Sequence, residues 1–113
     1  MVQNRNKLIS LFIGNTANIV VHRLLEKAID DETIVNKYIK EEIISLNIAK
    51  KYREKINPVK GVLPKKDSKY IKKRLMNTVK SELLSRISRG YENIDLEMVE
   101  ESVEKVLQEM SVE

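Results

Sequence analysis

The residues that could carry acid–base, nucleophilic or metal chemistry are few and scattered. His22 is the only histidine and the chain has no cysteine, which excludes His-rich metal sites, thiolate nucleophiles and Cys-ligated zinc. The three glycines lie far apart, so neither a glycine-rich phosphate loop nor a dinucleotide-binding fingerprint can form. We therefore expect a protein without catalytic activity, metal or cofactor.

One row of acidic side chains could in principle bind a hard cation together with a partner's carboxylates. The row consists of Glu97, Glu100, Glu101 and Glu104. A solvated acidic helix face is the commoner outcome for such a row, because Glu is rarely buried unless it is paired. His22 stands alone in a predicted helix, beside Arg23. A single histidine in such a position is more often structural than catalytic or metal-binding, so we expect a structural role.

Basic residues are concentrated in the middle of the chain. Residues 50–89 hold fourteen basic and three acidic residues, a net charge of +11, whereas residues 90–113 have a net charge of −7. Such a segment attracts nucleic-acid phosphates or an acidic protein surface. The residues expected to contact a phosphate backbone are Lys51, Lys55, Lys65, Lys66, Lys69, Lys72, Lys73 and Arg74.

The composition of the basic segment bears on sequence preference, and its charge has one internal alternative. Lysines outnumber arginines ten to four in residues 50–89, whereas base recognition favours arginine, so we expect little sequence preference. The acidic residues 90–113 could instead lie beside the basic segment and neutralise it, through exposed pairs that contribute only about 0.2–1 kcal/mol each. Tyr52 and Tyr70 could stack on bases, although a core role is commoner for Tyr52.

A short resemblance points in the same direction. Residues 48–58, with the sequence IAKKYREKINP, resemble the end of the helical arm in the zinc-ribbon protein subunit of archaeal ribonuclease P. In that family metal-binding cysteines follow this arm, and this chain has no cysteine. The resemblance therefore adds slightly to the nucleic-acid interpretation and implies neither a metal site nor an activity.

The elements that must position these residues are helices. A chain of 113 residues with 42% hydrophobic and 34% charged residues is expected to fold as one soluble domain, residues 1–113. Only three Gly and two Pro leave too few turns for a sandwich or barrel. The fold class that we predict is all-α, an antiparallel four-helix bundle, or a five-helix bundle if the first helix breaks at Gly14 and Asn15.

Periodic apolar residues and stop signals place these helices. The first is expected over residues 4–28, and the second over residues 32–56, ended by Asn57 and Pro58. The third should begin at a cap on Asp67 or Ser68 and end at Gly90, and the fourth should follow Asp95 as its N-cap.

Two apolar surfaces suggest a rival function as an oligomerisation or adaptor module that binds a protein partner and no nucleic acid. The apolar arc of helix 32–56 covers about half of its circumference, so this helix is either central in the bundle or lends surface to another subunit, as in a homodimer. The fourth helix has an a/d seam that either packs on its own bundle or binds a partner. The expected interface residues are Val35, Ile39, Leu46, Leu96, Val99, Val103, Val106 and Met110.

The sequence also bears on the compartment. The absence of cysteine fits a reducing cytosol, and polar residues interrupt every stretch that could approach the roughly 20 apolar residues of a membrane span. The apolar run 8–13 is short and is followed by Gly14, Asn15 and Thr16, so we interpret it as mature protein and not as a signal peptide. We expect a cytoplasmic protein with no membrane insertion.

Overall fold

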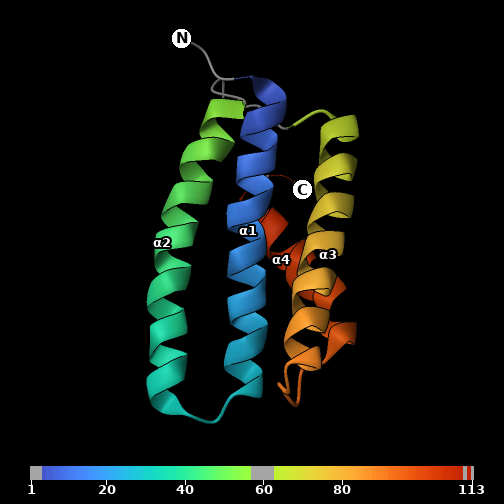
Figure 1. The fold of residues 1–113 in the computed structure, drawn as a ribbon. Coiled ribbons are helices and arrows are strands. Elements are labelled where there is room, and N and C mark those ends of the chain that lie inside the picture. Colours follow the sequence, from blue (N-terminus) through green and yellow to red (C-terminus); the bar gives the residue numbers. More distant parts are fainter. Residues whose placement is uncertain (1–3, 57–62, 111, 113) are drawn as a thin grey trace.

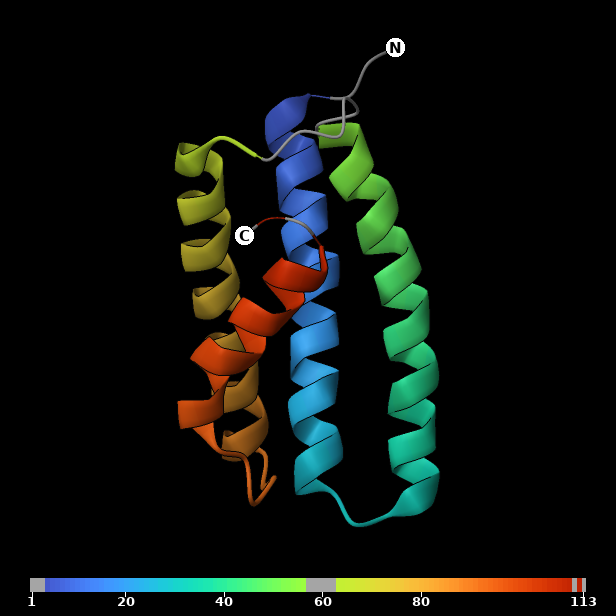
Figure 2. The same ribbon diagram turned by 180° about the vertical axis from the view of Figure 1, so that it is seen from behind.

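The computed structural model describes residues 4–56, 63–110 and 112. These residues form α-helices and one 3-10 turn, with no strand among them, which confirms the all-α prediction. The elements are α1 (Arg5–Ala28), α2 (Glu32–Ile56), α3 (Lys65–Ser88), η1 (Leu96–Met98) and α4 (Val99–Glu109). Consecutive helices run in opposite directions, and α4 crosses obliquely behind α1 and α3 (Figure 1 and Figure 2).

The central helix of the bundle is α1. It packs against α2, α3 and α4, and α2 and α3 lie on opposite sides of it in both views (Figure 1 and Figure 2). Phe12, Ile19 and Leu25 are completely buried in it. The prediction that helix 32–56 could be central is therefore wrong, because α2 lies at the edge of the bundle and its principal packing partner is α1.

Of the two alternatives for the first helix, the continuous one is correct, because no break occurs at Gly14 and Asn15. The polar residues after Gly14 form hydrogen bonds within the helix instead of capping a new one: Asn15 Nδ2 donates to the Leu11 carbonyl at 2.9 Å and Thr16 Oγ1 to the Phe12 carbonyl at 2.7 Å. At its start, the Asn4 side chain accepts a hydrogen bond from the backbone N–H of Asn6 at 2.8 Å. The bundle consequently has four α-helices in the described residues and not five.

Helix α2 has the predicted bounds. Its first turn is capped by Asp31, whose carboxylate accepts a hydrogen bond from the backbone N–H of Thr33 at 2.9 Å. The small residues Ser45 and Ala49 are buried, so the helix can approach α1 closely at mid-length. The predicted stop at Asn57 and Pro58 lies outside the described residues.

Helix α3 begins earlier than predicted. Its first residue is Lys65 and its N-cap is Pro64, which offers no side-chain cap. Asp67 and Ser68 are not caps because their side chains bind elsewhere: Asp67 pairs with Arg5 at 2.7 Å and Ser68 Oγ donates to the Val112 carbonyl at 2.9 Å. The buried residues Ile71, Leu75, Val79 and Leu83 recur every fourth position.

The C-terminal part begins differently from the prediction. Asp95 does accept a hydrogen bond from the backbone N–H of Glu97, at 2.9 Å, but the element that it caps is the 3-10 turn η1. Helix α4 starts only at Val99. Its apolar side closes the core from behind, where Val103 and Val106 are completely buried.

Helix α1 is long and apolar enough, by length and composition alone, to cross a membrane. From the sequence we expected no such helix, because polar residues interrupt this stretch. That expectation was wrong, since the mean hydropathy of an 18-residue window in α1 is still 1.4. Of that window, 67% is buried inside the fold. Burial among three neighbouring helices accounts for the apolar composition, since a helix covered on most sides must be apolar on most sides.

Candidate nucleic-acid interface

Three helix ends bring basic side chains together at one end of the bundle. The N-terminus of α1, the C-terminus of α2 and the N-terminus of α3 all lie at the upper end in Figure 1, and Figure 2 agrees. The exposed cations of these three helix ends, which we call the basic end, are Arg5, Lys7, Lys50, Lys51, Lys55, Lys65, Lys66 and Lys69. The acidic residues described in the same stretches are Glu54 and Asp67.

The predicted phosphate-contacting residues are placed as follows. Lys51 and Lys55 lie in the last turns of α2, on the other side of α1 from Lys65, Lys66 and Lys69 in the first turns of α3. All five are exposed. The fold thus places cations from two distant parts of the predicted basic segment at the same end of the molecule.

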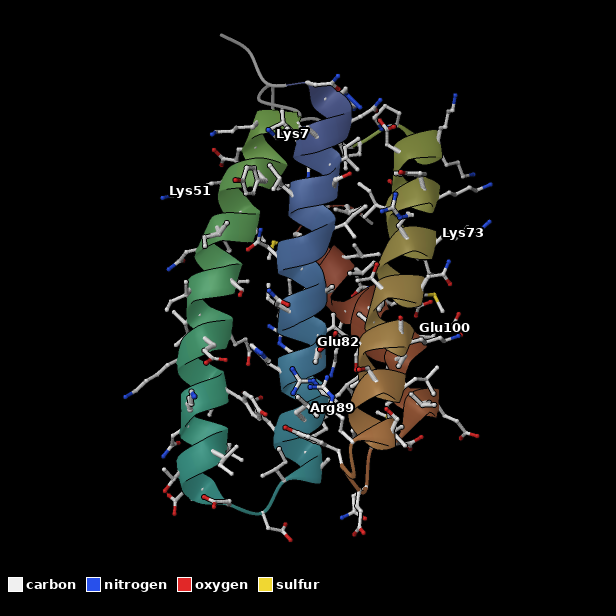
Figure 3. All side chains as sticks on the ribbon, viewed as in Figure 1. Lys7, Lys51, Lys73, Glu82, Arg89 and Glu100 are labelled. Carbon is white, nitrogen blue, oxygen red and sulfur yellow. The ribbon has the colours of Figure 1, made fainter. Side chains whose placement is uncertain are left out.

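The remaining predicted residues lie further along α3. Lys73 is exposed on the outer side of this helix (Figure 3). Arg74 stacks on the ring of Tyr70 at 5.6 Å and donates to its hydroxyl at 2.7 Å. Lys72 is half-buried and bonded to Glu104 at 2.9 Å. Lys73 and Arg74 extend the positive surface along α3, whereas Lys72 points toward α4.

Two cations of the basic end come from a segment whose charge gave no signal. Arg5 and Lys7 belong to residues 1–49, where basic and acidic residues balance. The net charge of this segment therefore gave no reason to predict a phosphate-binding role for them. They join the site because the start of α1 lies between the end of α2 and the start of α3 (Figure 1). Lys7 and Lys51 are labelled together in the upper part of Figure 3.

Helix dipoles also contribute to the potential at this end. Helices α1 and α3 both direct their positive N-termini toward it (Figure 1). The negative C-terminus of α2 lies there too, beside its own Lys50, Lys51 and Lys55. A cation in the last turn stabilises a helix by itself, which is the purely structural explanation for Lys55, whereas Lys50 and Lys51 lie one turn earlier.

Internal neutralisation by the acidic C-terminal part is limited in the described residues. The ion pair between Lys72 and Glu104 joins α3 to α4. Glu97, Glu100 and Glu101 are exposed, and α4 begins in the lower half of the molecule, away from the basic end (Figure 2; Glu100 in Figure 3). Most of the acidic surface is therefore separated in space from the basic one.

The expected protein-interface residues divide into two groups. Val99, Val103, Val106 and Met110 are buried in the core of their own bundle, so the a/d seam is already occupied by the same chain. Val35, Leu46 and Leu96 are half-buried and Ile39 is 41% exposed. The most exposed large apolar residues of α2 were not among those expected: Ile43 at 54% and Ile44 at 60%.

His22 lies in a polar cluster between α1, α2 and the end of α3. Its ring stacks on Tyr38 at a centroid distance of 5.1 Å, and its Nε2 is 3.6 Å from a carboxylate oxygen of Glu41. Burial lowers the pKa of His22, and the nearby Arg86 lowers it further, against the opposing effect of Glu41. Arg86 in turn stacks on the ring of Tyr91 at 5.6 Å.

The described residues of this cluster do not assemble a metal site. In the part of the chain that the structure describes, no group of three or more His, Cys, Asp or Glu side chains could hold a metal ion. Within the cluster, the His22 ring of α1 stacks on Tyr38 of α2, and Arg86 of α3 stacks on Tyr91, which follows the end of α3.

Comparisons with protein-family models, with curated proteins and with solved structures find no match for this chain. Any functional assignment therefore depends on the residues and the geometry described above.

Proposed function

We propose that this protein is a small non-enzymatic binding protein that contacts the phosphate backbone of nucleic acid through its basic end. The observation that carries the proposal is the convergence of cations from three helix ends, with Glu54 and Asp67 as the acidic residues described among them. Because phosphates are neutralised by such cations without reading of base edges, the binding would have little sequence preference. No cofactor is needed for it.

The test is the salt dependence of binding to labelled RNA and duplex DNA, followed by fluorescence anisotropy. Each phosphate contact on duplex DNA contributes about 0.9 to the slope of log affinity against log salt. Replacing Lys65 and Lys69 with Gln should weaken binding and reduce this slope by about two. Both side chains are exposed, so the fold should be unaffected.

A matched control removes the same charge elsewhere. Lys27 and Lys105 are also exposed, but they lie on α1 and α4 away from the basic end. Replacing this pair with Gln should leave the slope close to that of the unmodified protein. Equal losses in the two double variants would reject the basic end as the binding surface, and no binding at low salt would reject the function.

The second candidate function is that of a protein-binding module. The specific observation in its favour is the exposure of Ile43 and Ile44 on α2, since soluble proteins seldom leave large aliphatic side chains clustered on the surface. An acidic protein surface could also occupy the basic end. The absence of nucleic-acid binding together with self-association or partner binding would favour this candidate.

A further inference from the structure

The outer side of α2 carries an unpartnered apolar surface. Its exposed isoleucines, which we call the isoleucine face, are Ile39, Ile43, Ile44 and Ile48, with exposed fractions of 41, 54, 60 and 37%. At about 100° per residue, Ile43 and Ile44 fall on the side turned away from the buried Ser45 and Ala49. By the same spacing, the exposed side chains of Lys40 and Lys51 lie on the side between Ile43 and Ile44.

A groove with complementary chemistry lies on the opposite edge of the bundle, between α3 and the segment formed by η1 and α4. It has a volume of about 500 Å³. The residues that line this acidic groove are Met76, Lys80, Leu84, Leu96, Glu97 and Glu100. Its apolar wall includes Leu84, which is 52% exposed. The rim formed by η1 and α4 carries the exposed carboxylates of Glu97 and Glu100, and the α3 side carries the exposed Lys80, so the lining has a net charge of −1.

The two surfaces cannot meet within one molecule, because α2 and α3 are on opposite sides of α1 (Figure 1 and Figure 2). They can meet between two molecules. Isoleucines beside a lysine fit an apolar groove with an acidic rim, both in hydrophobicity and in sign of charge. We propose that the isoleucine face of one copy docks into the acidic groove of the next, which gives a head-to-tail association of identical chains.

A symmetric contact between two copies of α2 fits less well. In an antiparallel pairing centred on Ile44, Lys37 of one copy would face Lys51 of the other, and in a parallel pairing each lysine would face its own equivalent. Like charges placed directly opposite each other disfavour association. The charge pattern therefore favours the heterologous contact, in which the two partners use different surfaces.

The experiment is sedimentation velocity on the full chain, without nucleic acid, over a wide range of protein concentrations at low salt. We expect the sedimentation coefficient to rise with concentration. Ile44→Glu and Leu84→Glu should each abolish this rise, because each introduces a charge into one of the two surfaces. Both residues are more than half exposed, so far-UV circular dichroism should remain that of the unmodified protein.

A mixture of the two variants makes the test specific. The Leu84→Glu protein retains an intact isoleucine face and the Ile44→Glu protein an intact groove, so an equimolar mixture should form dimers that do not grow further. Tyr70→Glu, a control at a residue that is 47% exposed on α3 outside the groove, should associate like the unmodified protein.

Several results would overturn the proposal. A sedimentation coefficient independent of concentration would exclude the association. Loss of association in Ile44→Glu alone would indicate a symmetric contact through α2, and failure of the mixture to form dimers would exclude complementary surfaces. None of these outcomes depends on whether the basic end binds nucleic acid.

Discussion

Glu26 of α1 faces a second carboxylate, that of Glu42 on α2. Burial raises the pKa of Glu26 to about 7, and a hydrogen bond and charge repulsion with Glu42 raise it as well. Arg23 opposes this effect, but it is already bonded to Glu42 at 2.8 Å and to Glu109 at 2.9 Å. The two carboxyl groups can therefore share a proton near neutral pH.

This pair predicts a pH dependence of stability. Because the pKa of folded Glu26 lies above its ordinary value of 4.5, the folded state holds the proton more tightly than the unfolded state. Its contribution to stability is complete below pH 4.5 and is lost as the pH rises through about 7. Glu26→Gln, which imitates the protonated form, should stabilise the protein more at pH 8 than at pH 5, by up to about 1 kcal/mol after solvent screening.

Urea unfolding of both proteins at the two pH values measures this difference. Glu54→Gln makes the same chemical change at an exposed position of α2 and should give no pH-dependent gain. An equal gain for Glu26→Gln at both pH values would contradict the shared proton.

At the residue scale, the sequence predicted exposure better than it predicted partners. Seven of the eight expected phosphate-contacting residues are exposed, as long charged side chains usually are. Arg53 was counted with the same charged segment, yet it is only 8% exposed and its Nε donates to the Met110 carbonyl at 3.1 Å. A contact across 57 positions leaves no local signal in the sequence.

Glycine has opposite roles in two elements of this fold. Gly14 lies inside α1, where an added Cβ would meet nothing within 4 Å. Gly90 follows the end of α3 with a φ of 102°, in the region that L-residues with side chains seldom adopt. The first glycine weakens a helix and the second ends one.

The two glycines therefore predict opposite effects of the same substitution. Gly14→Ala should raise the free energy of unfolding by about 0.5–1 kcal/mol, because alanine loses less backbone entropy in a helix. Gly90→Ala should lower it by about 1 kcal/mol, because a Cβ strains the left-handed conformation. Urea denaturation of both variants measures these changes. A Gly14→Ala protein that is less stable than the unmodified protein would contradict the prediction for α1.

At the element scale, helix ends were predicted correctly where residues close in the sequence determine them. Helix α2 begins at its predicted position, where Asp31 caps it, and Gly90 follows the end of α3 as predicted. The start of α3 was wrong because Asp67 and Ser68, which could have been caps, bind Arg5 and the Val112 carbonyl. The alternative with a break at Gly14 does not occur because neighbouring polar side chains form hydrogen bonds within the helix.

At the scale of the whole molecule, the apolar pattern of the sequence could not predict which helix lies at the centre of the bundle. A wide apolar arc shows how much of a helix is apolar but not which neighbours cover it. The arc of α2 suggested a central helix, whereas the structure has α1 at the centre and leaves Ile43 and Ile44 of α2 exposed. Similarly, the meeting of three helix ends depends on the topology, and so Arg5 and Lys7 could not be assigned to the basic end in advance.

The arrangement of α2 and α3 on opposite edges of α1 has a consequence for the length of nucleic acid that each copy would occupy. In head-to-tail copies related mainly by translation across the bundle, every basic end would face the same side. The backbone spans 24 and 23 Å in the two directions across its long axis, and duplex DNA rises about 3.4 Å per base pair. The expected footprint is therefore roughly seven to ten base pairs per copy once side chains are added.

Stoichiometric titration of duplexes of increasing length would measure this footprint. The number of bound copies should increase by one with each added repeat of that size, and occupancy of one site should promote occupancy of the next. Copies bound without mutual preference would show that the basic ends act independently, and Ile44→Glu is expected to produce that independent binding.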